Sequence, residues 1–169
     1  NSLTFSQNNV TNIFNITNSD SVMLSSNTLA TNYFTTSTSS TIDSNTLNIF
    51  NITDFSSGTI NNNEVDSANG ISFYLQNVDS CTISNNDVQS TSGAFYLNES
   101  DSNTIYTNWV KDNTFGLNLT STSTGNTIYD NYFENTVTNV HDDIGNTWYT
   151  TYACGTPNIV GGPCIGGNF

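Results

Sequence analysis

The sequence predicts an all-β fold, a single-stranded parallel β-helix (solenoid) of about eight coils, and three observations support this prediction. One frame occurs seven times: an apolar residue, two other residues, Asn, one residue and a second apolar residue. Successive frames begin 18 to 23 residues apart, which is typical of one coil of a repeat fold. No segment has the periodicity of an amphipathic helix.

The Asn of each frame is expected to form an internal ladder. Its side chain carries donors and acceptors together, so stacked copies can bond from coil to coil. Asn also tolerates the left-handed backbone of a sharp corner. The predicted ladder consists of Asn8, Asn27, Asn45, Asn63, Asn86, Asn108 and Asn131.

The apolar residues of the frame are expected to fill the interior in two columns. A coil this short cannot bury its apolar face alone, whereas stacking at about 4.8 Å per coil pairs every strand with its neighbours. Trp148 opens an eighth turn. The pairs before it are Phe5 and Val10, Leu24 and Leu29, Ile42 and Leu47, Ile60 and Val65, Ile83 and Val88, Ile105 and Val110, and Ile128 and Phe133.

The chain divides into a repeat region and a tail. The first three coils end at about residue 57 and the following ones are longer by about four residues, so the cross-section should change near Gly58. The longer coils carry a second strand, as in 71–75 and 115–119, where apolar residues alternate. We therefore predict a β-helix over residues 1–150 and a Gly/Pro-rich cap or docking segment over residues 151–169.

The cysteines differ in their expected roles. Cys154 and Cys164 bracket a short Gly/Pro-rich loop, a size that a disulfide pins well. Cys81 lies two residues before Ile83, the first apolar residue of its frame. Later coils carry Asn103 and Asn126 at this position, so Cys81 is interpreted as a small residue in a stacked column. An intermolecular disulfide from Cys81 is the alternative.

Composition excludes several classes of function. Fourteen acidic residues face one base, Lys111, and give a formal charge of −13. Such a field repels phosphates, so no nucleic-acid partner is expected. No apolar run is long enough to span a membrane. The abundance of Asn, Ser and Thr favours an extracellular or cell-surface location.

The repeat resembles that of the NosD-like and carbohydrate-binding right-handed parallel β-helix proteins, through anchors such as Asn103–Ile105 and Asn126–Ile128. The ending over residues 145–169 is similar to the closing segment of such domains in secreted archaeal surface proteins. Relatives of this kind include lyases, glycosidases, a copper-site maturation factor, adhesins and surface-layer components. Function must therefore be argued from the sites.

Five sequons could carry N-linked glycans. Most of them fall at similar distances before the first apolar residue of the next frame, and hence near one edge of the solenoid. In the repeated pentapeptide IFNIT, apolar neighbours should turn the Asn outward. The sequon residues are Asn9, Asn15, Asn51, Asn98 and Asn118.

Aromatic residues recur on the outward positions of coils six to eight. They could form one patch that stacks on sugar rings or contacts another subunit. Cross-strand stacking that only stabilises the surface is the alternative. The residues are Tyr106, Trp109, Tyr129, Tyr132 and Tyr149.

Two acidic pairs could hold Ca²⁺. Glu64 and Asp87 share an outward position in adjacent coils, and Asp79 and Asp101 share a turn position. Carboxylates about 5 Å apart either bind a cation or raise one another's pKa. A solvated acidic surface is the alternative, and no other cofactor is expected.

Catalysis is not expected. β-Helix lyases use Arg or Lys on acidic substrates, and this chain has only Lys111. Inverting glycosidases need two convergent carboxyls, whereas Asp142 and Asp143 are neighbours that point to opposite faces if extended. His141 lacks a nearby Cys or Met with which to form a soft copper site.

The predicted function is that of a non-catalytic extracellular structural protein, a glycosylated subunit of a filament, sheath or surface layer. Copies would stack end to end into a homopolymer through the first coil, around 5–10, and the tail. The rival is a sugar-binding or adhesion module of a larger cell-surface protein, with glycans as partners. A degenerate glycosidase or lyase is a third alternative.

Overall fold

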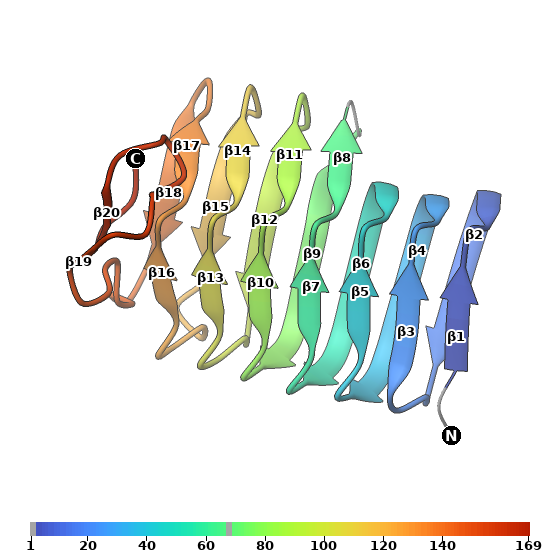
Figure 1. Cartoon of the computed structure of the whole chain (residues 1–169). Helices are drawn as coiled ribbons and strands as arrows, with labels where there is room; N and C mark the ends of the chain where they lie inside the picture. Colours follow the sequence, from blue (N-terminus) through green and yellow to red (C-terminus); the bar gives the residue numbers. More distant parts are fainter. Residues whose placement is uncertain (1–2, 67–68) are drawn as a thin grey trace.

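The chain winds into a parallel β-solenoid in the computed structural model, which describes residues 3–66 and 69–169 (Figure 1). One side of the solenoid is a seven-stranded parallel sheet, here called sheet 1. Its strands are β1 (Leu3–Ser6), β3 (Val22–Ser25), β5 (Thr41–Asp43), β7 (Thr59–Asn61), β10 (Thr82–Ser84), β13 (Thr104–Tyr106) and β16 (Thr127–Tyr129). Among the described residues no helix has the length and apolar character needed to cross a bilayer.

The number of coils is smaller than predicted. Seven strands in sheet 1 are joined by six complete turns, not about eight. The eighth turn, expected at Trp148, contributes one isolated bridge between Thr127 and Thr147. After this bridge the chain enters the Gly-rich tail and forms no further strand of sheet 1.

The rest of the solenoid is an eleven-stranded sheet, here called sheet 2. In the first three coils it is built from single long strands, and in later coils a loop divides each long strand in two. The branch occurs at β6, which pairs with both halves of the next coil. The loops that follow β11, β14 and β17 project from one side in Figure 1. The strands are β2 (Asn9–Thr17), β4 (Thr28–Thr38), β6 (Thr46–Ser56), β8 (Glu64–Asp66), β9 (Ile71–Asp79), β11 (Asp87–Gln89), β12 (Gly93–Asn98), β14 (Trp109–Lys111), β15 (Phe115–Leu119), β17 (Tyr132–Glu134) and β18 (Thr138–Asp142).

The predicted Asn ladder is confirmed. Asn86 represents the pattern: its Oδ1 accepts hydrogen bonds from the backbone N and Nδ2 of Asn63, both at 3.0 Å. Its Nδ2 donates to Asn108 Oδ1 at 2.9 Å and to Ile60 O at 3.1 Å. Equivalent side-chain bonds of 2.9 to 3.0 Å join all seven residues. The ladder thereby satisfies buried backbone amides at every corner.

The sharp corner itself lies one residue before the ladder. The ladder residues do not have positive φ; their predecessors do, with φ between 51° and 58°. The expectation that the ladder Asn takes up the left-handed conformation is therefore wrong. The preceding residue makes the turn, which leaves the Asn side chain directed inward. These predecessors are Gln7, Ser26, Ser44, Asn62, Asn85, Thr107 and Asp130.

Apolar columns fill the tube as the frame predicts. The first apolar residues of the frames stack in register from Phe5 to Ile128. The second apolar residues of the frames stack in the same way from Val10 to Phe133. Phenylalanines from successive coils also stack, with ring centroids 4.9 Å apart for Phe73 and Phe95. The interior is thus continuous along the axis.

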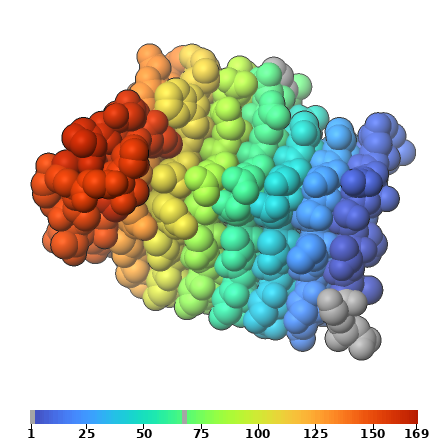
Figure 2. Space-filling model, in the orientation of Figure 1, coloured from blue at the N-terminus to red at the C-terminus, as the bar shows by residue number. Residues whose placement is uncertain are grey.

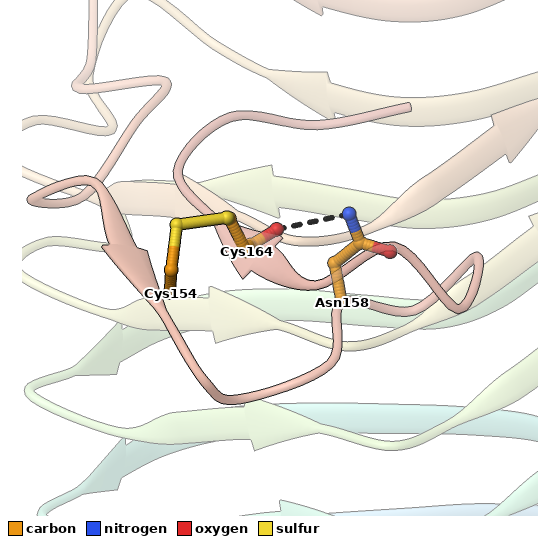
Figure 3. Close-up of a disulfide and its surroundings, with 3 residues drawn as sticks. All are labelled: Cys154, Asn158 and Cys164. Carbon is orange, nitrogen blue, oxygen red and sulfur yellow. Dashed lines mark hydrogen bonds between the residues drawn. A yellow bond between two sulfur atoms is a disulfide. The ribbon is translucent and has the colours of Figure 1, made fainter.

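The C-terminal tail closes the last coil. Strands β19 (Ala153–Cys154) and β20 (Cys164–Ile165) form an antiparallel hairpin, which contains the predicted Cys154–Cys164 disulfide (Figure 3). Asn158 Nδ2 donates to Cys164 O at 2.9 Å within the same loop. In Figure 2 the tail covers one end of the solenoid.

The end of the tail also continues the ladder. Asn168 Oδ1 accepts from Asn131 Nδ2 at 2.9 Å, and Phe169 pairs with Asn131 and Phe133 through backbone bonds of 2.9 Å. Asn168 thus acts as an additional rung, which the repeat frame does not predict because the tail lies outside the frame.

Replacing Asn86 with Ala should destabilise the fold strongly. The substitution leaves the backbone N–H and one Nδ2–H of Asn63 without an acceptor in the interior, and it removes the Asn86 donor to the Ile60 carbonyl. We expect a loss of about 4 kcal/mol in the free energy of unfolding, measured by urea denaturation. Asn48→Ala is the control, because Asn48 is exposed on β6, and it should change stability by less than about 0.5 kcal/mol. Equal losses in the two variants would contradict a structural role for the ladder.

Candidate functional surfaces

Three of the five sequon asparagines lie in one outward row on sheet 2. Register pairing places Asn15, Asn51 and Asn118 in a column with tyrosines between them. At about 4.8 Å per coil, Asn15 and Asn51 are roughly 10 Å apart along the axis. We call this column the lateral row. Its members in order are Asn15, Tyr33, Asn51, Tyr74, Tyr96, Asn118 and His141.

The side-chain nitrogens of all five sequon asparagines are uncommitted. None of them donates a hydrogen bond to a described residue, whereas the ladder asparagines use Nδ2 inside the protein. Asn98 lies beside the lateral row, where its Oδ1 accepts from Thr120, the Thr of the Asn118 sequon, at 3.2 Å. Asn9 is exposed at the start of β2. Each sequon therefore presents a free amide nitrogen at the surface.

The aromatic residues form two stacks instead of one patch. Tyr106 and Tyr129 stack on sheet 1, with centroids 5.3 Å apart and planes 3° apart. Trp109 and Tyr132 stack on sheet 2 at 4.2 Å. The ladder corner separates the two stacks, because Thr107 and Asn108 lie between β13 and β14. Tyr149 belongs to neither and is 68% exposed.

Two tyrosines of these stacks, Tyr132 and Tyr129, have raised pKa values. The Tyr132 hydroxyl donates to Glu134 Oε2 at 2.6 Å, and this bond raises the pKa of Tyr132. Burial raises the pKa of Tyr129, and Tyr106 and Asp130 add to the rise. Both hydroxyls thus stay protonated at neutral pH and can serve as hydrogen-bond donors.

The acidic pairs lie in register as predicted, but each carboxylate of the turn pair is bound to backbone. Asp79 Oδ1 accepts from the backbone N of Asp101 at 2.8 Å, and Asp101 Oδ1 accepts from Thr124 N at 2.6 Å. Glu64 and Asp87 are neighbours across β8 and β11. No group of three potential metal ligands occurs among residues 3–66 and 69–169. The turn pair thus stabilises loops of adjacent coils.

The pKa of Asp87 reflects its burial and two charged neighbours, Lys111 and Asp66. Partial burial raises the pKa of Asp87, Lys111 opposes this rise, and Asp66 adds to it. Repulsion between carboxylates is thus present, but burial is the main cause.

Cys81 occupies a stacked column as expected. Its thiol lies where later coils place an Asn side chain, accepts from Gly58 N at 3.4 Å and donates to Asp79 O at 3.2 Å. Its own backbone N donates to Asn103 Oδ1, the start of a second ladder through Asn103, Asn126 and Asn146. Burial raises the pKa of the thiol to about 11. Such a buried, protonated thiol is chemically inert.

Asp142 terminates this second ladder. Its carboxylate accepts from Asn146 N at 2.6 Å and from Asn146 Nδ2 at 2.9 Å. In a continuing ladder, the Asn of the following coil would accept from these same two donors. Trp148 Nε1 donates to the Asp142 carboxylate as well, at 2.8 Å. Partial burial opposes the charge, but these bonds outweigh burial and lower the pKa of Asp142. The His141 and Asp143 side chains lie outside this network, exposed and 3.6 Å apart.

The full length of the chain, residues 1–169, matches the family model described as periplasmic copper-binding protein (NosD). The chain belongs to the NosD family. A periplasmic setting agrees with the predicted location outside the cytoplasm. No match was found among curated proteins.

Copper, which the NosD description implies, does not fit the donors of this member. The sole Met, Met23, lies on β3, and the sole His, His141, lies on β18, five coils away or about 24 Å along the axis. Cys81 is buried, and Cys154 and Cys164 are joined in a disulfide. Soft copper sites need convergent thiolate, thioether or imidazole ligands, which these residues cannot supply.

We therefore expect no saturable copper site in this chain. Equilibrium dialysis against Cu(I), kept reduced by ascorbate so that the Cys154–Cys164 disulfide stays intact, should give less than one tightly held ion per chain, with His141→Ala unchanged from the parent protein. A one-to-one site that disappears in His141→Ala or Met23→Ala would contradict this reading of the donors.

Asp142 should titrate below the usual range of a carboxyl. Because its folded pKa is lowered, its contribution to stability is complete above the unfolded pKa and is lost as pH falls through the folded value. The Trp148 Nε1–H resonance, followed by NMR, should shift only below about pH 4. Asp142→Ala should lower the free energy of unfolding at this end of the solenoid by about 2 kcal/mol. Asp143→Asn is the control, and a midpoint above the ordinary Asp value would contradict the proposed network.

Proposed function

We propose that this chain is a non-catalytic structural protein of the cell envelope or exterior, a glycosylated subunit of a filament, sheath or surface layer. Copies would stack end to end. The NosD family assignment supports an envelope setting, and the solenoid supplies a rod of constant register. The main support for end-to-end assembly is the distribution of exposed apolar side chains.

Exposed large apolar side chains concentrate at the two ends of the rod. Among the described residues twelve are exposed, and ten of these lie within residues 3–23 or 137–169. Ile13 on β2 is 64% exposed at one end, and Val137 is 68% exposed at the other. Apolar patches of this kind mark interaction sites. Their placement favours contacts between ends over contacts between sides.

The two ends differ, which suits a head-to-tail contact. Strands β1 and β2 each have one strand neighbour, so their outer edges offer unpaired backbone groups. The opposite end carries the tail and its apolar residues, such as Tyr152 at 73% exposure. A contact between two different surfaces does not close on itself, so repetition generates a filament.

The sides of the rod suit glycosylation. Asn9 and Asn15 lie on the edge strand β2, whereas the sequon residues Asn51, Asn98 and Asn118 lie on β6, β12 and β15 of sheet 2, away from the end surfaces. Glycans there would leave the ends bare for assembly and would solvate a surface that carries few charges.

The uses of the carboxylates support a non-catalytic role. Asp20 accepts from Thr38, Asp54 from Asn77, and Asp101 from Thr124. Asp142 terminates a ladder. Each of these groups is a fixed acceptor for the fold.

Assembly can be tested with an end-surface variant. The full chain should form filaments by electron microscopy as its concentration rises. Ile13→Lys, which places a charge on the exposed edge strand, should raise the concentration needed for assembly at least about tenfold. Asn48→Lys, on an exposed position away from the ends, should assemble normally. Monodisperse short rods at all concentrations would contradict the assembly.

The rival function is sugar binding by the aromatic stacks, and the parallel, stacked rings of Tyr106 and Tyr129 favour it as a second candidate. A glycan array would distinguish the two. Binding that is lost in Trp109→Ala while assembly persists would support a sugar-binding module.

A further inference from the structure

An apolar groove lies on sheet 2 beside Asn118. Its volume is about 290 Å³. This is at the lower limit of small-molecule pockets and suits a single ring. The residues around it are mostly apolar, with Asn118 and Ser92 as its polar members. The groove is lined by Gly70, Ile71, Ser92, Gly93, Phe95, Tyr96, Phe115 and Asn118.

Gly93 creates this groove. It lies in register between Ile71 of one coil and Phe115 of the next. Its φ is not in the left-handed region, and an added Cβ would be 3.4 Å from Ile71 Cγ1, an ordinary contact. Neither backbone geometry nor crowding therefore requires Gly here. The missing side chain leaves a slot between two apolar neighbours.

The slot has an aromatic lining beside a free amide. Phe115 is 47% exposed, and Tyr96 is held by stacking on Tyr74 with planes 9° apart. Asn118 follows Tyr96 in the lateral row, and its Nδ2 donates to no described residue. An apolar surface therefore adjoins an atom to which a sugar can be attached.

We propose that the first sugar linked to Asn118 lies in this groove, with the C–H face of its ring packed against Phe115 and Tyr96. This proposal rests on the proposed glycosylation. Attachment consumes a lipid-linked oligosaccharide phosphate: Asn118 Nδ2 bonds to the anomeric carbon, the bond from that carbon to the phosphate oxygen breaks, and the amide loses one proton. A pyranose has an apolar face that suits an aromatic ring, and a single ring suits the volume.

The other sequon asparagines of the lateral row, Asn15 and Asn51, do not line this groove. Asn51 lies in register between Tyr33 and Tyr74, but it does not line this cavity. The two sites thus share a row, an outward direction and a free nitrogen. They differ in the groove, which makes Asn51 a matched control for Asn118.

The test is the rate at which a peptide N-glycosidase removes each glycan from the folded full chain, secreted by a eukaryotic host. Site-resolved mass spectrometry follows Asn118 and Asn51 in one sample. Removal at Asn118 should be roughly three- to tenfold slower than at Asn51, because the seated sugar must leave the groove first. In the denatured protein the two rates should converge.

Two variants approach the groove from different sides. Phe115→Ala removes one wall, and Gly93→Val fills the slot from the strand. Either variant should raise the rate of glycan removal at Asn118 to the rate at Asn51. Tyr33→Ala, beside Asn51, should leave the Asn118 rate unchanged.

Three results would overturn the proposal. Absence of any glycan at Asn118 would overturn it together with glycosylation at this site. A glycan at Asn118 with equal rates at both sites would overturn the seating alone and leave the glycosylation standing. Binding of free N-acetylglucosamine oligomers by Asn118→Gln, abolished by adding Phe115→Ala, would assign the groove to a free saccharide.

Discussion

The hydrogen bonds between the buried asparagine side chains are the constraint on which the rest of the structure depends. A primary amide in an apolar interior is costly unless its oxygen and its nitrogen both find partners. In this chain the partners are another Asn, a backbone amide and a carbonyl of an adjacent coil, as at Asn86. These partners meet only when neighbouring coils are in one register. The outward columns, including the lateral row and both aromatic stacks, inherit that register.

Coil length can vary because the ladder does not depend on it. The spacing between rungs ranges from 18 to 23 residues, yet the side-chain bonds stay between 2.9 and 3.0 Å. Extra residues enter as loops between the halves of sheet 2, away from the ladder corner. Two further ladders begin in the later coils, through Asn103 and Asn113. The part of the rod nearest the tail is therefore the most extensively cross-linked by amides.

Sequence alone was sufficient for features that repeat and insufficient for features that do not. The frame predicted the ladder, the interior columns and the change in coil length, because each depends on one residue type at a fixed offset. Asn168 could not be found in this way, since it reaches Asn131 across 37 residues outside the frame. The groove depends on a side chain that is absent at Gly93. The aromatic residues divide into two stacks because the corner at Asn108 directs neighbouring strands into different sheets.

The direction of the ladder bonds gives the rod an electrical polarity. In each ladder the carbonyl oxygen accepts from the preceding coil and the amide nitrogen donates to the following one. The side-chain dipoles therefore add along the axis, with oxygen toward β1 and N–H toward the tail. The carboxylate of Asp142 lies at the N–H end, as an anion does at a helix N-terminus. Rods joined in the same sense continue this alignment, whereas rods joined in opposite senses set like poles against each other.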